Sequence, residues 1–288
     1  MLTQNEVTDF FRRQLQMWPE AAARFAALDN VLMREMDIDG FDGFGVTVSH
    51  NPARIQSSAA KVDKASIAAR RCFLCDANRP PQQQHIDWGD YRILVNPFPI
   101  LPEHFTIIAK EHRPQSIVGA IADMTRLSSL LPDFAIFYNG PACGASAPDH
   151  FHFQAVRRSA LPMFGTTTLP FGVIRLSGDM ASQHGVDAVL DRLPRDGEES
   201  EPKVNIFCTC ENGAPEITII PRRRHRPDFY GEEGLLISPA SIDLAGVIVA
   251  PRLKDYENIT TDTIRSIYSQ LCFSQSEINE LTHDLNTQ

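Results

Sequence analysis

The stretch GASAPDHFHFQ, residues 144–154, is the most informative part of the sequence. Its second half predicts a β-strand, on which successive side chains point to opposite faces of a sheet. His150, His152 and Gln154 then share one face, while the two phenylalanines between them lie on the other face and pack against helices. A sheet face with two imidazoles and an amide, backed by buried phenylalanines, indicates a functional site.

The residues before this strand suit phosphate chemistry. Gly144, Ala145 and Ser146 form a loop of small residues, whose backbone N–H groups can approach a phosphate closely. A histidine of the strand can attack phosphorus, because neutral imidazole is available near pH 7, and a histidine–nucleotide intermediate divides one difficult transfer into two easier ones. The alternative is a strand whose imidazoles are satisfied in the core or at the surface, since metal sites and chance also produce His-x-His.

The composition is that of an ordinary globular chain. It has 288 residues with 27 basic and 36 acidic side chains, and therefore a net charge of −9. This balance argues against general binding to nucleic acid or anionic membranes, although it permits a local basic pocket. No apolar run approaches the ~20 residues that span a bilayer, and the first residues lack the apolar region of a signal peptide. We therefore expect a cytoplasmic protein with reduced thiols that binds neither nucleic acid nor membrane.

Periodicity along the chain predicts an α+β fold. Apolar residues at helical spacing predict a helix over residues 4–28, which Pro19 kinks or divides. Further helices are expected at about 116–131, within 178–201, and at about 259–285. Strands are expected at 46–55, 91–95, 105–109, 134–140, 150–156, 204–210, 216–224 and 242–252. Their short connections favour an antiparallel sheet.

The stretch 144–154 resembles the active-site strand of the histidine-triad superfamily, in particular its transferase branch, where the triad ends in His-x-His-x-Gln. This branch includes galactose-1-phosphate uridylyltransferase, diadenosine tetraphosphate phosphorylase and the GDP-hexose (GDP-galactose/glucose) phosphorylases. Upstream, ILPEHFTIIAKEH (100–112) is similar to the first hairpin of the superfamily. Downstream, SPASIDLAGVIVAPRLKDYENIT (238–260) is similar to the C-terminal segment of the GDP-hexose phosphorylases. The resemblance covers roughly residues 46–260.

This resemblance implies a histidine-triad-like (HIT-like) antiparallel sheet with packed helices, built as one well-formed triad half and a degenerate C-terminal half. We expect an N-terminal helical segment at 1–45 and a catalytic half with the His-x-His-x-Gln strand at 46–175. The C-terminal half, with a linker and a helical tail, is expected at 176–288.

The resemblance also implies roles for single residues. His152 would be the nucleophile that accepts a nucleotidyl group, and Gln154 would position that group. Asn139 and Ser146, together with the loop that begins at Gly144, would contact its phosphate. The sequence departs from the family pattern at Asp149, which lengthens the loop between the serine and the first histidine by one residue.

Two cysteines point to a metal site. Cys72-Phe-Leu-Cys75 has the spacing of a metal knuckle, since two thiolates three residues apart can chelate one zinc ion. The resemblance to the uridylyltransferases adds His112 and His150 as further ligands. Four protein ligands imply a closed, structural zinc site that fixes the strand of His152 without taking part in the chemistry. The alternative is a pair of buried, reduced cysteines.

Other polar residues give weaker signals. The run Arg222–Arg226 is locally basic on an acidic chain and offers phosphate contacts; a solvated strand end or a contact with a partner subunit is the alternative. Arg54 lies in a segment that is often near the nucleotide in this branch, and Lys110 is a candidate phosphate ligand. For His104 we favour a hydrogen-bonded role in the fold over a substrate contact.

We predict a nucleotidyltransferase or phosphorylase that acts on a nucleoside diphosphate-hexose through a covalent histidine–nucleotide intermediate. Its partners are a nucleotide-sugar and either phosphate or a sugar phosphate, with zinc as the structural cofactor. The alternatives are a hexose-1-phosphate nucleotidylyltransferase, a dinucleoside polyphosphate phosphorylase and, from another class, a non-catalytic nucleotide- or zinc-binding protein. The base, the sugar and the acceptor are left open, as is a homodimer, which the superfamily often forms.

Overall fold

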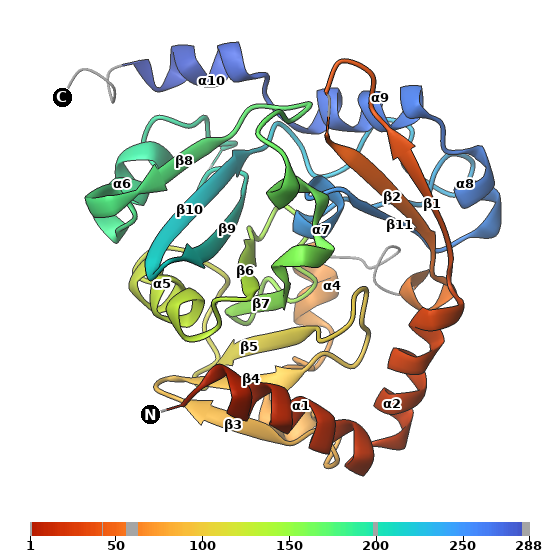
Figure 1. Cartoon of the computed structure of the whole chain (residues 1–288), viewed down its shortest axis with the longest axis vertical. Coiled ribbons are helices and arrows are strands. Elements are labelled where there is room, and N and C mark those ends of the chain that lie inside the picture. The colour runs from red at the N-terminus through yellow and green to blue at the C-terminus, as the bar shows by residue number, and fades with distance from the viewer. Residues whose placement is uncertain (1, 42, 56–62, 198–200, 284–288) are drawn as a thin grey trace.

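An eight-stranded antiparallel sheet carries the histidine strand (Figure 1). The computed structural model describes residues 2–41, 43–55, 63–197 and 201–283. In these ranges the strands of the large sheet follow the order β3-β4-β5-β7-β6-β9-β10-β8. They are β3 (His85–Trp88), β4 (Tyr91–Val95), β5 (Phe105–Ala109), β6 (Phe134–Asn139), β7 (His152–Arg157), β8 (Ile174–Ser177), β9 (Val204–Glu211) and β10 (Ala214–Pro221). Because β9 pairs with β6, strands from both predicted halves share one sheet.

A second, three-stranded sheet consists of β1 (Leu32–Asp37), β2 (Gly45–His50) and β11 (Val247–Ala250). The β2–β11 pair is parallel, which differs from the antiparallel pairing that we predicted. A parallel pair requires a long crossover, and here most of the chain lies between the two strands. The strand β1 also corrects the prediction that residues 1–45 are helical, because β1 pairs with β2 as an antiparallel hairpin.

Helices cover one face of the large sheet. The apolar residues of α1 (Gln4–Met17), α5 (Ile121–Leu130) and α6 (Gln183–Leu190) form one core with Phe153 of β7 and with Phe151, which lies directly before this strand. Figure 1 shows α1 across the β3–β5 end of this sheet and α5 near its β9–β10 end. The predicted N-terminal helix is divided in two at Trp18, because α2 (Pro19–Ala26) begins at a proline, a residue favoured in the first turn of a helix.

The opposite face of the large sheet is covered by the small sheet and by helix α9 (Thr261–Leu271), through a second core. The remaining helices are α4 (Lys64–Ala68), α7 (Ser241–Leu244), α8 (Leu253–Asn258) and α10 (Gln275–Leu281). The predicted end of the C-terminal helix at 285 lies outside the described residues. None of the helices in the described ranges has the length and apolar character to cross a membrane.

The predicted strand alternation is found in β7. The strands expected at 91–95 and 105–109 have those bounds, whereas β7 begins at His152, so His150 lies in the loop before it. Phe153 is in the helix-side core, and His152 and Gln154 face a cavity on the other side. The short strands β3 and β8 were not predicted.

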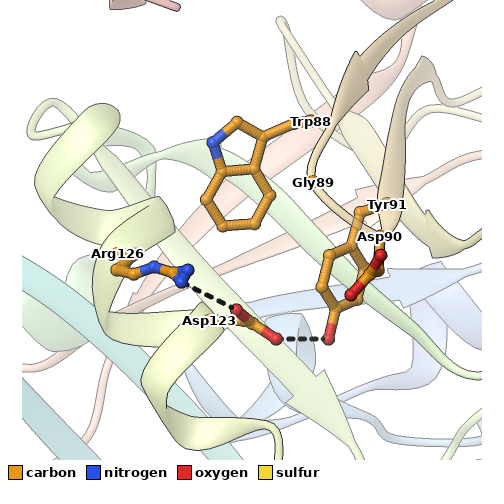
Figure 2. Close-up of a pocket in the computed structure, with 6 residues that line it drawn as sticks. All are labelled: Trp88, Gly89, Asp90, Tyr91, Asp123 and Arg126. Atoms are coloured by element: carbon orange, nitrogen blue, oxygen red, sulfur yellow. Dashed lines mark hydrogen bonds and ion pairs between the residues drawn. The ribbon is translucent and has the colours of Figure 1, made fainter. Parts of the chain in front are cut away.

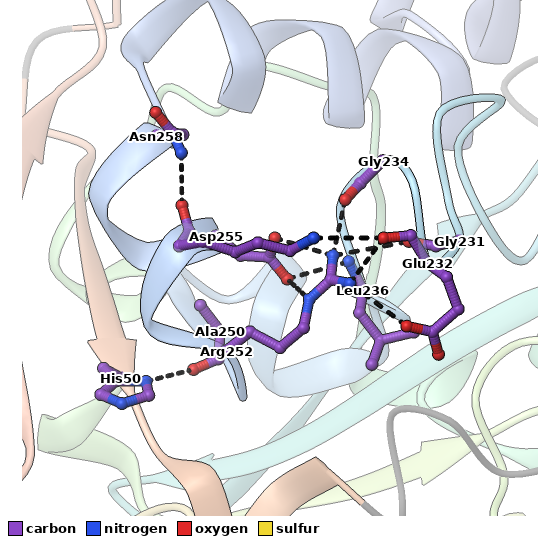
Figure 3. Close-up of polar contacts among 10 residues, drawn as sticks. His50, Gly231, Glu232, Gly234, Leu236, Ala250, Arg252, Asp255 and Asn258 are labelled. Atoms are coloured by element: carbon purple, nitrogen blue, oxygen red, sulfur yellow. Dashed lines mark hydrogen bonds and ion pairs between the residues drawn. The ribbon is translucent and has the colours of Figure 1, made fainter.

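Polar contacts order the loop that leads to the C-terminal wall of this cavity (Figure 3). Arg252 donates to the carbonyl oxygens of Glu232 at 2.8 Å and Gly234 at 2.6 Å, and it pairs with the buried Asp255 at 2.6 Å. Asp255 in turn accepts the N–H of Leu236 at 3.1 Å. This clamp fixes residues 231–236, directly before the residues at 238–243 that line the cavity.

Candidate active site

A cavity of about 690 Å³ lies on the face of the sheet that carries His152. Strands β4, β5, β6 and β7 form its floor, the segment 70–83 and the loop 96–100 form one end, and residues 225–249 form the other. A cavity of this size accommodates a nucleotide-sized ligand. The predicted residues Arg54, Asn139, Gly144 and Ser146 line it together with His152 and Gln154.

The imidazole of His152 is held in one tautomer. Its Nδ1 lies 2.9 Å from the carbonyl oxygen of His150. A carbonyl oxygen only accepts, so Nδ1 carries the proton and Nε2 keeps its lone pair. Among the residues that the structure describes, no group is hydrogen-bonded to Nε2. Burial lowers the pKa of His152 to about 4, so the ring is neutral near pH 7. This arrangement suits a nucleophile.

Gln115 fixes the backbone around His152. Its Oε1 accepts the N–H of His152 at 2.8 Å, and its Nε2 donates to the carbonyl oxygens of His152 and Asn139, both at 3.0 Å. Gln115 therefore joins the ends of β6 and β7 that carry the two candidate site residues. No local pattern in the sequence predicts this role, because Gln115 lies in an irregular loop before α5.

The amide of Gln154 has a fixed orientation. The N–H of Ile100 donates to Nδ1 of His104 at 3.3 Å, so the proton of this neutral imidazole is on Nε2. Nε2 lies 2.8 Å from Oε1 of Gln154 and donates to it. Burial lowers the pKa of His104 to about 3, which keeps the ring neutral. The oxygen of Gln154 is thus occupied, and its NH₂ group is left as a donor to the cavity. His104 has the hydrogen-bonded role that we favoured.

The amide of Asn139 is oriented in the same sense. Its Oδ1 accepts three hydrogen bonds: from the N–H of Ser241 at 3.0 Å, from Oγ of Ser241 at 2.6 Å, and from Nδ2 of Asn205 at 2.8 Å. A backbone N–H only donates, so the amide cannot be turned over without loss of these bonds. Nδ2 of Asn139 therefore remains as a second donor beside His152.

The loop before β7 requires glycine at position 144. Gly144 has a φ of +99°, and a Cβ atom there would lie 2.5 Å from Cβ of Ala240. The loop therefore packs closely against the C-terminal wall of the cavity. Ser146 is exposed at the cavity edge, and its carbonyl oxygen lies 3.4 Å from Nη2 of Arg70.

Arginines line the cavity, although our candidate lysine does not. Nζ of Lys110 pairs with Asp87 at 2.8 Å, and Lys110 is absent from the cavity wall. Arg24, Arg70 and Arg226 line the wall besides Arg54. Arg70 pairs with Asp149 at 2.6 Å, and its Nη1 is buried with no hydrogen-bond partner among the described residues. The extra residue Asp149 thus holds an arginine at the cavity.

The basic run 222–226 is divided between three environments. Arg222 is buried and donates to Oδ1 of Asn205 at 2.6 Å. Arg223 pairs with Glu277 of α10 and lies 4.3 Å from the ring centroid of Phe273. His225 and Arg226 line the cavity. The run is therefore neither a continuous phosphate site nor a simple solvated strand end.

The four predicted metal ligands come together. Sγ of Cys72 lies 3.3 Å from Nδ1 of His150, and Sγ of Cys75 lies 3.2 Å from Nδ1 of His112. All four ligand atoms lie within 4.8 Å of one another. A tetrahedral zinc ion, with bonds of about 2.3 Å to sulfur and about 2.0 Å to nitrogen, places S and N about 3.5 Å apart. Nε2 of His150 donates to the carbonyl of Ala109 at 2.8 Å, which leaves Nδ1 free of a proton. These residues can hold a metal ion.

Comparison with known proteins places the chain in a family and a fold. Residues 10–157 match a sequence family described as a domain of unknown function, DUF4922. The chain belongs to this family. No curated protein matches it.

This DUF4922 chain has the fold of yeast Ap4A phosphorylase Apa2. A crystal structure of that enzyme has a TM-score of 0.58 and 17% identity, and covers 89% of this chain and 97% of the enzyme. Its complex with AMP has a TM-score of 0.58 and 17% identity, and covers 91% and 97%. Its complex with Ap4A has a TM-score of 0.57 and 18% identity, and covers 95% and 99%. The predicted HIT-like α+β fold is confirmed.

A second cavity, of about 240 Å³, lies between the β3–β4 turn and helix α5 (Figure 2). Its wall includes Trp88, Tyr91, Asp123 and Arg126. Asp123 accepts from the hydroxyl of Tyr91 at 2.9 Å and lies 3.6 Å from Arg126. Its carboxylate is therefore already paired, and no nucleophile or metal ligand set accompanies it in the described wall. The candidate nucleophile and the oriented amide donors lie in the larger cavity.

Proposed function

We propose that the chain is a nucleotidyltransferase in which His152 accepts a nucleoside monophosphate from a dinucleoside polyphosphate. The observation that carries this proposal is the fixed tautomer of His152, whose Nδ1–H is held by the carbonyl of His150. Its Nε2 lone pair is thereby available in a cavity where Asn139 and Gln154 offer N–H donors.

The donor class is supported by the fold comparison and by the charge of the cavity. Structures with this fold are of an Ap4A phosphorylase, and one is a complex with Ap4A. Four arginines, Arg24, Arg54, Arg70 and Arg226, line the cavity of a chain whose net charge is −9. Guanidinium groups match phosphate oxygens, and a polyphosphate chain carries more charge than the diphosphate of a nucleotide-sugar.

The nucleoside diphosphate-hexose predicted from the sequence is the second candidate donor. One observation favours it: residues 238–260, which resemble the GDP-hexose phosphorylases, supply Ser238, Ala240 and Asp243 to the cavity wall. Both donors require the same first step on His152, so one experiment can compare them.

The reaction divides into two displacements at phosphorus. In the first, Nε2 of His152 forms a bond to the α-phosphorus, and the P–O bond to the leaving nucleotide or sugar phosphate breaks. The NH₂ groups of Asn139 and Gln154 donate to the phosphoryl oxygens as charge develops there. In the second, an oxygen of inorganic phosphate attacks the same phosphorus, the N–P bond breaks, and a nucleoside diphosphate is released. Nε2 then regains its lone pair, while Nδ1 keeps its proton throughout.

We include a structural zinc ion in the proposal. Two thiolates and two imidazoles are the donor set that zinc prefers, and four protein ligands leave no position for substrate. When bound, the ion supplies structural support only. Cys72, Cys75, His112 and His150 would tie the segment before the cavity to the strand of His152. The cytoplasmic location, the homodimer and the lack of nucleic-acid binding stay predictions from the sequence.

Intact-mass spectrometry tests the proposal. The chain is mixed with Ap4A, or with ADP-, GDP- or UDP-hexoses, in the absence of phosphate. We expect an adduct of one nucleoside monophosphate with Ap4A, and its loss on addition of phosphate. The His152→Asn variant should form none, whereas His184→Asn, an exposed histidine on α6, should behave as the unaltered chain. An adduct that forms with a nucleotide-sugar but not with Ap4A would contradict the first donor and support the second. Folded protein that forms no adduct with any donor would favour a non-catalytic binding protein.

A further inference from the structure

One end of the cavity offers aromatic rings to a planar ligand. Phe73 and Phe98 line it, and they are 46% and 39% exposed. Each ring has an arginine on one face: the guanidinium of Arg70 lies 4.8 Å from the centroid of Phe73, and that of Arg24 lies 4.4 Å from the centroid of Phe98. A ring that is covered on one face can stack a nucleobase on the other.

Gln83 gives this end a defined polarity. Its side chain is buried at 8% exposure and lines the cavity. Nε2 donates to the carbonyl oxygen of Val95 at 3.0 Å. Because that carbonyl only accepts, the amide cannot be turned over, and Oε1 points away from Val95. Within the described ranges Oε1 has no hydrogen-bond donor. An acceptor that faces the cavity without a protein donor can bind a ligand that supplies an N–H.

Asn78 adds a second acceptor at the rim. Its Nδ2 donates to the carbonyl oxygen of Cys72 at 2.9 Å, which leaves Oδ1 as the available atom. Asn78 and Gln83 therefore present oxygens to the cavity, whereas Asn139 and Gln154 present NH₂ groups. The cavity therefore has amide donors beside His152, suited to phosphate, and amide acceptors at Gln83 and Asn78, where Arg24 and Arg70 cover the rings of Phe98 and Phe73.

The two ends are separated by a distance that a nucleotide can span. Gln154 pairs across the sheet with Thr106, and Thr106 pairs with Leu94. The next residue, Val95, accepts the hydrogen bond from Gln83. Two strand spacings amount to roughly 10 Å. This matches the reach from an α-phosphate, across the ribose, to the outer edge of its base.

We propose that Gln83, assisted by Asn78, selects nucleotides whose base carries an amino group. The inference rests on the proposed function, since it concerns the base of the nucleotide that His152 receives. Among the purine bases, the 6-amino group of adenine and the 2-amino group of guanine are the two sources of this chemistry. A base with an oxo group in the same place would bring one acceptor oxygen against another, the side-chain Oε1 of Gln83.

Calorimetric titration of the full chain with nucleoside monophosphates tests this selection. AMP is compared with purine riboside 5′-monophosphate, which lacks the 6-amino group, and GMP is compared with IMP, which lacks the 2-amino group. We expect the amino-bearing member of at least one pair to bind about tenfold more tightly, as one additional hydrogen bond provides. Equal affinity within twofold in both pairs would overturn the proposal.

Variants assign the effect to Gln83. Gln83→Leu should abolish the preference and leave the affinity of the weaker ligand unchanged, which also reports that the cavity is intact. Gln82→Leu, an exposed neighbour outside the cavity wall, should keep the preference. A preference that survives Gln83→Leu would refute the assignment; if that variant does not fold, the ligand pairs on the unaltered chain decide. Calorimetry measures binding without nucleotidyl transfer. Equal affinities in this experiment would therefore not contradict adduct formation on His152, and the absence of an adduct would not contradict a base preference in binding.

Discussion

Replacement of Asn139 by aspartate should remove a hydrogen-bond donor to phosphate from the cavity while keeping the hydrogen bonds that position the side chain of residue 139. Oδ1 of Asn139 accepts from two groups of Ser241 and from Nδ2 of Asn205. A carboxylate oxygen accepts the same three bonds. The second carboxylate oxygen takes the place of Nδ2, so a donor becomes a charged acceptor. Residue 139 is 4% exposed, and burial opposes ionisation, but three donors favour the carboxylate.

The magnitude follows from these contacts. Loss of one donor to a developing charge costs about 2.7–4 kcal/mol, or about 10²–10³ in rate. A negative charge about 4 Å from a phosphoryl oxygen adds about 4 kcal/mol of repulsion at an effective dielectric constant near 20. We therefore expect Asn139→Asp to slow formation of the His152 adduct by at least about 10³, with a thermal midpoint close to that of the unaltered chain.

Quenched-flow mass spectrometry with Ap4A measures the rate of adduct formation, and calorimetry measures the midpoint. Ser241→Ala is the matched control, since it removes one donor to Oδ1 and keeps the other two. It should lower stability by about 1 kcal/mol and change the rate far less than Asn139→Asp does. A folded Asn139→Asp variant that reacts within threefold of the unaltered rate would show that Nδ2 does not face the phosphoryl group.

Three other properties can be checked on the same protein. A chelator should release one zinc ion per chain and lower the thermal midpoint of unfolding by about 5 °C or more. Elemental analysis should find no zinc in Cys72→Ser. It should find the zinc content of the unaltered chain in Cys208→Ser, because Cys208 is a buried cysteine outside the ligand group. Burial lowers the pKa of His104 from 6.5 to about 3, so the unfolded chain takes up a proton that the folded chain does not, and stability is lost as the pH falls below 6.5. Urea titrations should show that His104 accounts for about 2 kcal/mol of the free energy of unfolding that is lost between pH 7 and pH 5. The His104→Gln variant should lack this part of the loss, and identical pH profiles for the variant and the unaltered chain would contradict the prediction. Phe153→Ala removes a fully buried ring 4.9 Å from that of Phe151 and should cost about 3–5 kcal/mol in urea unfolding, whereas a cost below about 1 kcal/mol would mean that the core closes around the gap.

The features that the sequence predicts well are those with a local period or a recognisable spacing. Alternation along 152–155 predicts which side chains of β7 face the core and which face the cavity, because a strand repeats every two residues, whereas His150 lies in the loop before the strand. Pro19 predicts the division of the first helix, since proline interrupts a helix and begins the next one. The resemblance to the uridylyltransferases predicts the Cys72, Cys75, His112 and His150 group, whose donors converge in the structure.

The missed residues have no such local signature. Gln83, Asn205 and Gln115 are single polar residues whose roles depend on a partner distant in sequence: the carbonyl of Val95, the amide of Asn139 and the backbone of His152. The same limit explains Lys110. A lysine at a strand end near the predicted site looks like a phosphate ligand, but the β3–β4 hairpin brings Asp87 to it, and that pairing depends on tertiary structure.

The C-terminal half at residues 176–288, which we predicted to be degenerate, has a specific role in the orientation of the Asn139 amide. It carries no second histidine triad, yet it supplies the groups that orient Asn139. Arg222 donates to Oδ1 of Asn205 and thereby fixes that amide, so that Nδ2 of Asn205 is directed to Oδ1 of Asn139. Ser241, at the start of α7, completes the set. The oxygen of Asn139 is held by Asn205 of β9 and Ser241 of α7, and its NH₂ group is thereby directed to the cavity. The predicted C-terminal half therefore affects the proposed chemistry through the orientation of one amide, although none of these three residues needs to touch the substrate.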